Sequence, residues 1–151
     1  MTPTQWIDQN IDGEQAKSGC LAIVSLAAPV FGEAKISEGA LHFQTTIDAE
    51  TVSVMSIYRN HFETTAAEPT LLIFPKPVRD KVPAISDVAL RDYVIGAFSS
   101  ALKTENRSSG PEPTFLAKAA APASCHENLR QVFAYYRHRI LEAATGSHAS
   151  S

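Results

Sequence analysis

The chain has 151 residues, of which 44% are hydrophobic and 19% are charged. These fractions are typical of a globular domain and exclude a disordered, collagen-like or coiled-coil protein. A formal net charge of -3 argues against a general nucleic-acid-binding protein. Two cysteines are too few for a disulfide scaffold or for a zinc site built on cysteines.

We expect a single domain over residues 1–146, followed by a frayed tail over residues 147–151. The longest apolar run, residues 20–31, is shorter than the roughly 20 residues that a membrane-spanning helix needs. Acidic residues outnumber lysine before this run, which is the wrong charge for a signal peptide. These observations favour a soluble cytoplasmic protein without membrane contact, in which Cys20 and Cys125 are free thiols or form one disulfide.

The first half of the chain predicts a short helix and a β-hairpin. The helix covers residues 4–8 and is capped by Thr4. The long apolar run after it is interpreted as a buried strand, although a helix also fits. Apolar and polar residues then alternate over residues 41–47 and 51–58, a period typical of strands with one buried face, and a three-residue turn joins them. A further short strand is predicted over residues 71–74.

The second half of the chain predicts two amphipathic helices. A proline-rich connection over residues 75–83 is expected to be extended. The first helix begins at Ser86, and apolar residues recur along it at helical spacing. After a loop over residues 106–113, Ser124 and Glu127 form a capping box that opens the second helix.

Together these elements predict a two-layer α+β fold. An antiparallel sheet of about four to five strands packs against the two amphipathic helices, and a short helix lies at the N-terminus. The order of these elements resembles that of small acidic secretion chaperones, which pair helices with an antiparallel sheet that dimerises. The resemblance concerns the architecture and extends to no particular residue.

Cys125 is the first candidate for catalysis. A thiol in the first turn of a helix lies at the positive end of the helix dipole, which lowers its pKa. His42 or His61 could accept its proton, whereas the adjacent His126 points in another direction around the helix. The alternative is a surface cysteine beside the capping box.

Sites for metals and cofactors have less support in the sequence. His42, His61 and Glu63 could approach one another on the hairpin, but the histidines lack the spacing of known metal motifs. Solvated hairpin residues are the simpler interpretation. The glycines do not cluster, so neither a phosphate-binding loop nor a dinucleotide motif is present. We expect no metal and no cofactor.

Two surfaces are candidates for binding a protein partner. On the second hairpin strand, Met55 and Ile57 are predicted to be exposed, which would leave an apolar sheet face open to a partner. On the last helix, a basic and aromatic band lies beside the apolar stripe and consists of Arg130, Tyr135, Arg137, His138 and Arg139. The alternatives are that the N-terminal helix and residues 60–70 cover the sheet, and that the band is a solvated helix face.

The sequence thus favours a small non-enzymatic interaction protein of the adaptor, chaperone or inhibitor type, which could form a homodimer. It would bind a protein, and not nucleic acid, through the exposed sheet face or the C-terminal helix. The alternative is a small enzyme or ligand-binding domain whose pocket lies between sheet and helices and uses Cys125, His42 and His61. A filled core would favour the first interpretation, and a cavity in which these side chains converge would favour the second.

Overall fold

The computed structural model describes residues 1–59 and 68–149. The strands of its sheet are β1 (Lys35–Ile36), β2 (Ala40–Ile47), β3 (Glu50–Tyr58), β4 (Thr70–Ile73) and β5 (Thr114–Leu116). The α-helices are α1 (Pro3–Asn10), α2 (Glu14–Phe31), α3 (Lys76–Lys81), α4 (Val88–Leu102) and α5 (His126–Ala149).

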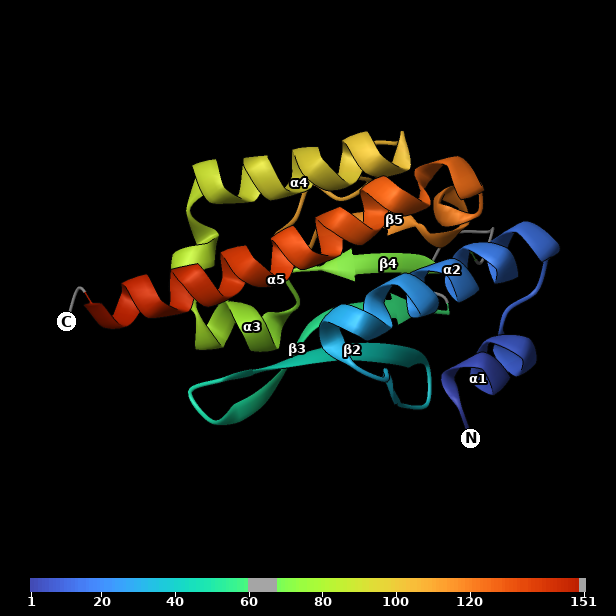
Figure 1. Ribbon diagram of the computed structural model, residues 1–151, viewed down its shortest axis with the longest axis horizontal. Helices are drawn as coiled ribbons and strands as arrows, with labels where there is room; N and C mark the ends of the chain where they lie inside the picture. The colour runs from blue at the N-terminus through green and yellow to red at the C-terminus, as the bar shows by residue number, and fades with distance from the viewer. Residues whose placement is uncertain (60–67, 150–151) are drawn as a thin grey trace.

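The sheet is antiparallel throughout, and its five strands are neighbours in chain order. Figure 1 shows α2, α5 and α4 running side by side over one side of this sheet. The predicted two-layer α+β class, the antiparallel sheet and the short N-terminal helix are confirmed. The covering layer contains three long helices, one more than predicted.

Residues 20–31 belong to α2 and do not form the predicted strand. Cys20, Ile23 and Ala27 recur at helical spacing and are buried, while Leu21 between them is exposed. An uninterrupted apolar run fits a buried strand and a buried helix equally well, so its packing partners decide which forms.

β2 and β3 form the predicted hairpin, but its turn is tighter than expected. Glu50 pairs with Ile47, so the turn contains two residues, Asp48 and Ala49. Both have positive φ angles, of 52° and 66°, as the type I′ turn requires. This turn matches the twist of the two strands, which explains why the longer predicted turn does not form.

Met55 and Ile57 are fully buried, so the prediction of an exposed apolar sheet face at these residues is wrong. Met55 lies opposite Phe43 in the register, and the Phe43 ring lies 6.4 Å from the ring of Phe31 on α2. Ile57 lies opposite Leu41 on the same side. We call this side, which the helices cover, the inner face of the sheet, and the opposite side its outer face.

A tyrosine of α5 compensates for an irregularity in the sheet. The register of β2 and β3 shifts by one residue, which makes Val54 the extra residue of a β-bulge. The Tyr136 hydroxyl donates a hydrogen bond to the Val54 carbonyl and accepts one from the Phe74 backbone N–H at 2.8 Å. One buried hydroxyl thus satisfies two backbone groups at points where regular strand pairing stops.

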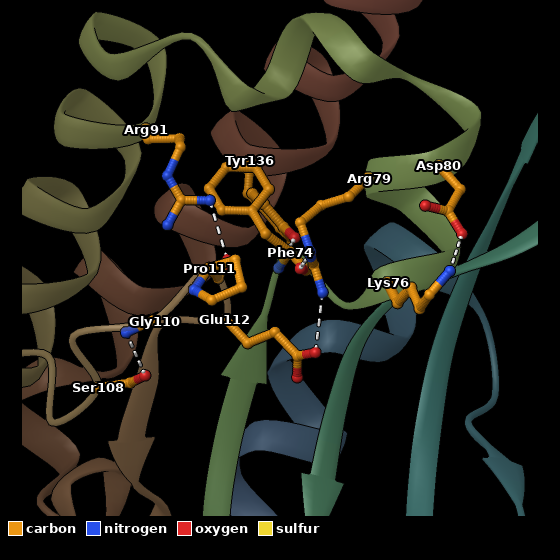
Figure 2. A network of polar contacts seen from close by, with 10 residues as sticks. All are labelled: Phe74, Lys76, Arg79, Asp80, Arg91, Ser108, Gly110, Pro111, Glu112 and Tyr136. Atoms are coloured by element: carbon orange, nitrogen blue, oxygen red, sulfur yellow. Dashed lines mark hydrogen bonds and ion pairs between the residues drawn. The ribbon is translucent and has the colours of Figure 1, made fainter.

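Phe74 is also the centre of the polar network in Figure 2. Its φ angle of 54° is in the left-handed region, which phenylalanine rarely adopts. Arg79 of α3 donates to the Phe74 carbonyl at 2.9 Å and forms an ion pair with Glu112 at 2.9 Å. Arg91 of α4 lies over the Phe74 ring and donates to the Pro111 carbonyl at 2.9 Å. The network therefore ties the loop before β5 to α3, α4 and, through Tyr136, to α5.

The helices begin a few residues away from their predicted caps. Thr2, and not Thr4, caps α1 and forms a capping box with Gln5. Asp87, and not Ser86, caps α4 through its side chain. In both cases the residue that caps is the one whose side chain reaches a free backbone N–H of the first turn.

Two other predictions for the second half of the chain need correction. The connection after β4 is not extended throughout but contains α3, with Pro77 in its first turn, where the missing N–H costs no helical hydrogen bond. The predicted capping box at Ser124 does not open α5, because this serine lies in the 3-10 turn Ala123–Cys125 that precedes the helix. α5 then continues through Gly146, its predicted end, to Ala149.

Candidate functional site

Cys125 lacks the environment of a reactive thiol. It is buried in the turn just before α5, and its Sγ donates to the Pro122 carbonyl at 3.1 Å. Burial raises the pKa of this thiol, so the prediction of a pKa lowered by the helix is wrong. The loss of water around the sulfur outweighs the contacts that favour a thiolate. Both cysteines are free thiols, and burial raises the pKa of Cys20 to about 12.

His42 does not lie near Cys125 in a common pocket. It stands on the outer face of the sheet, whereas the Cys125 sulfur contacts the carbonyls of the preceding turn. The space between the inner face and the helices is filled by the buried rings of Phe43, Phe98, Phe115, Phe133 and Tyr136. Among the described residues, no hydrogen bond or ion pair links His42 to Cys125. His61 and Glu63 lie outside the described residues.

The predicted band on the last helix divides between two sides of α5. Arg130 forms an ion pair with Glu127 at 2.6 Å, and Arg137 donates to the Thr45 hydroxyl of β2 at 3.3 Å. Tyr135 and Arg139 lie on the side that faces α4, and the Arg139 guanidinium is 6.0 Å from the Tyr135 ring. Of these four members of the band, only the last two therefore belong to one surface.

That surface is a groove between α4 and α5, which we call the α4–α5 groove. It contains two hollows, of about 390 and 330 Å³. The first is lined by residues that include Ala97, Ser100, Ala101, Asn128, Val132 and Tyr135. The second is lined by residues that include Asp87, Leu90, Arg139, Glu142, Ala143 and Gly146. The start of α4 thus lies beside the end of α5, so the two helices are antiparallel and the hollows follow one another along the groove.

Exposed apolar side chains gather on these same two helices. Val88 and Tyr93 of α4 are 70% and 67% exposed, and Tyr135 of α5 is 37% exposed. Of the other large apolar residues in the described part of the chain, only Met1 and Leu21 are exposed. Tyr93 stands one helical turn before Ala97 and therefore on the groove side of α4. Exposed tyrosines beside a groove are typical of protein-binding surfaces.

Contacts with Phe74 and between aromatic side chains hold α4 and α5, the two walls of the groove, in place. Tyr136 of α5 and Arg91 of α4 both contact the Phe74 ring, at 5.2 Å between ring centroids and 5.6 Å from guanidinium to centroid. Phe98 of α4 packs against Phe133 and Tyr136 of α5. These contacts fix the spacing of the two helices, so the groove between them is preformed.

A second polar feature crosses the outer face of the sheet, and we call it the His42 chain. The Ser37 hydroxyl lies 2.9 Å from His42 Nε2, and His42 Nδ1 lies 2.8 Å from the Ser56 hydroxyl. Ser56 in turn hydrogen-bonds to Tyr58, whose ring meets the imidazole edge-on at 6.2 Å. Burial, with the nearby Lys35 ammonium as a smaller cause, lowers the pKa of His42, so its neutral form is favoured.

Several residues of these two features were missed by the sequence analysis. Alternation places His42 on the polar side of its strand, whereas Ser56 alternates in step with the apolar Val54. The bulge and the pairing register that bring Ser56 beside His42 are tertiary properties. Ser37 follows a strand of two residues, which carries no sequence signal. Tyr93 could have been found, because it lies off the apolar stripe of a helix that was predicted.

Comparison of the chain with protein-family models, with curated proteins and with solved structures finds no match. Within the described residues, no group of three or more His, Cys, Asp and Glu side chains is placed to hold a metal ion. None of the helices described is both long and apolar enough to cross a membrane. Among the described residues, the α4–α5 groove and the His42 chain are two features from which a function can be inferred.

Proposed function

We propose that this protein is a small interaction protein whose α4–α5 groove holds an amphipathic helix of a partner protein. The observation that carries the proposal is a groove lined by the exposed Tyr135, with the exposed Tyr93 one helical turn before the lining residue Ala97 and with walls fixed by buried contacts. Such a groove suits an adaptor, a chaperone or an inhibitor equally, because all three recognise a segment of another protein.

The shape of the groove favours a helix as the bound segment. Small residues, among them Ala97, Ala101, Ala143 and Gly146, line both hollows, so the backbone of a third helix can approach closely. The two hollows follow one another along the groove, which suits large side chains that recur every three or four residues on one face of a helix.

The charges of the groove specify the chemistry of the partner. The hollow near Gly146 is lined by Asp87, Arg139 and Glu142. Glu142 already forms an ion pair with Arg139 at 2.8 Å, so the negative charge left over in this lining is that of Asp87, which also caps α4. The hollow near Ala97 has no charged residue in its lining. The partner helix should therefore carry apolar anchors along its length and a lysine or arginine at the end that meets Asp87.

A display library of amphipathic helical peptides tests this proposal. We expect the wild-type protein to enrich peptides with apolar residues at helical spacing and a basic residue at one end. Ala97→Arg places a long charged side chain in the wall of the groove, and the enriched peptides should bind this variant at least about tenfold more weakly, because one blocked anchor is enough for such a loss. Affinity is measured by fluorescence anisotropy.

Ala134→Arg is the matched control, because Ala134 is exposed on α5 and belongs to neither hollow. It should bind the enriched peptides as tightly as the wild type. Peptides that bind Ala97→Arg and the wild type equally would overturn the proposal. So would light scattering that finds a wild-type dimer and an Ala97→Arg monomer, because a second copy of the chain would then occupy the groove.

A further inference from the structure

We infer that Ser37 is a nucleophile that His42 activates toward small reactive esters. This inference concerns the outer face of the sheet and is independent of the α4–α5 groove. Ser37 is exposed, and its hydroxyl lies 2.9 Å from Nε2 of an imidazole whose other nitrogen is held by Ser56 at 2.8 Å. A nucleophile, a base and a group that orients the base are thus connected in one chain.

Activation of Ser37 uses the imidazole tautomer that carries its proton on Nδ1. In this tautomer Nδ1 donates to the Ser56 hydroxyl, and Nε2 is the acceptor for the Ser37 hydroxyl. The Ala40 carbonyl is a second acceptor for Ser37, at the longer distance of 3.3 Å.

The charges around the chain suit a base that works near neutral pH. The groups that face His42 from the neighbouring strands are Lys35 of β1 and Tyr58 of β3. Partial burial and the Lys35 ammonium keep the imidazole neutral and able to accept a proton. Lys35 pairs with His42 across the strands, so its positive charge lies on the same side of the sheet as the imidazole.

The reaction that this arrangement supports is acyl transfer from an ester to Ser37. The Ser37 oxygen forms a bond to the acyl carbon while its proton passes to His42 Nε2. The bond between the acyl carbon and the leaving oxygen then breaks, and the alcohol leaves with the proton from His42. Water next gives a proton to the same imidazole and attacks the acyl carbon, the bond to the Ser37 oxygen breaks, and the imidazolium returns the proton to that oxygen as the acid is released. Because Ser37 stands exposed just after an edge strand, small acyl groups with good leaving groups fit best.

A fluorophosphonate probe tests the nucleophile directly. The Ser37 oxygen would bond to phosphorus, fluoride would leave, and the proton would pass through His42 to solvent. We expect one label per chain, located at Ser37 by peptide mass spectrometry and absent in Ser37→Ala. His42→Gln should retain the fold and lose about a hundredfold or more in labelling rate, because a general base contributes that much.

Two variants serve as matched controls. His126→Gln removes an imidazole whose Nε2 lies 2.8 Å from the Ala120 carbonyl oxygen, and Ser18→Ala removes another exposed serine. Both should be labelled at the wild-type rate, and circular dichroism should show that all four variants are folded. Labelling at Ser37 that is no faster than at Ser18, or that is equally fast in His42→Gln, would overturn the inference.

Discussion

Tyr136 connects three elements of this fold through a single hydroxyl. It lies fully buried on α5, where its oxygen contacts the bulge in β3 and the backbone N–H of Phe74 at the end of β4. Burial raises the pKa of the phenol far above its ordinary value, so the hydroxyl stays protonated and able to donate. A buried polar group of this kind stabilises the fold only because both of its partners are satisfied.

The first prediction concerns this hydroxyl. Tyr136→Phe keeps the ring in the core but leaves the Val54 carbonyl and the Phe74 N–H without a partner. We expect the free energy of unfolding to fall by about 2–4 kcal/mol, since each unsatisfied buried group costs about 1–3 kcal/mol. Urea denaturation followed by circular dichroism measures the change.

Tyr135→Phe is the control for this prediction, because it removes the same atom from an exposed ring one residue away. It should change the free energy of unfolding by less than about 0.5 kcal/mol. Equal losses in the two variants would contradict the role assigned to the buried hydroxyl.

At the scale of elements, the packing of α2 depends on one glycine. Gly19 lies against the 3-10 turn Ala117–Ala120, and a Cβ added there would be 2.0 Å from the Ala117 carbonyl oxygen. Backbone atoms cannot rotate away as a side chain can, so helix and turn would have to separate. The glycine therefore sets how closely α2 can approach the segment that leads into α5.

The second prediction follows from this close approach. Gly19→Ala should destabilise the protein by about 1–3 kcal/mol or more, because overpacking outweighs the helix propensity that alanine adds. Gly96→Ala is the matched control, since a Cβ at this position of α4 meets nothing within 4 Å. It should stabilise the protein by up to about 1 kcal/mol. Thermal unfolding of both variants measures the effects. A Gly19→Ala protein that is more stable than the wild type would contradict the close approach of Gly19 to the Ala117 carbonyl.

At the scale of the whole molecule, the network of Figure 2 joins parts of the chain that are far apart in sequence. Arg79 of α3 and Arg91 of α4 hold Glu112 and Pro111, and both arginines also contact Phe74. The loop over residues 106–113, whose end is bonded to β4 through the Pro113 carbonyl, is thereby also fastened to the helices. Arg79 and Glu112 are partly buried, so their ion pair is screened less than a surface pair would be.

The third prediction tests this fastening. In the double variant Arg79→Ala with Arg91→Ala, the loop should open more often, and trypsin should cleave after Arg107 faster than in the wild type. Cleavage is followed by intact-mass spectrometry. A double variant with Lys76→Ala and Arg130→Ala removes two charges from exposed ion pairs and should be cleaved at the wild-type rate. Unchanged cleavage in the first double variant would contradict the fastening.

Local patterns predicted much of the fold. The alternation over residues 41–58 is a property of the backbone pleat, so it identified the hairpin without knowledge of its neighbours. The apolar stripes of α4 and α5 likewise follow from helical geometry alone. The two-layer α+β class follows from these elements, because each has one apolar face that must be buried.

Features that depend on contacts between two elements could be established only from the tertiary structure. The apolar run in α2 fits either kind of element, and only its contacts with the inner face and α5 make it a helix. Met55 and Ile57 are buried because α2 and its neighbours cover the face on which they lie, and a strand in place of that helix would have left them open. The α4–α5 groove depends on the spacing of two helices, and the His42 chain depends on the register of three strands. Sequence periodicity fixes which face of an element is apolar, whereas the partner that meets that face is set by packing across the whole domain.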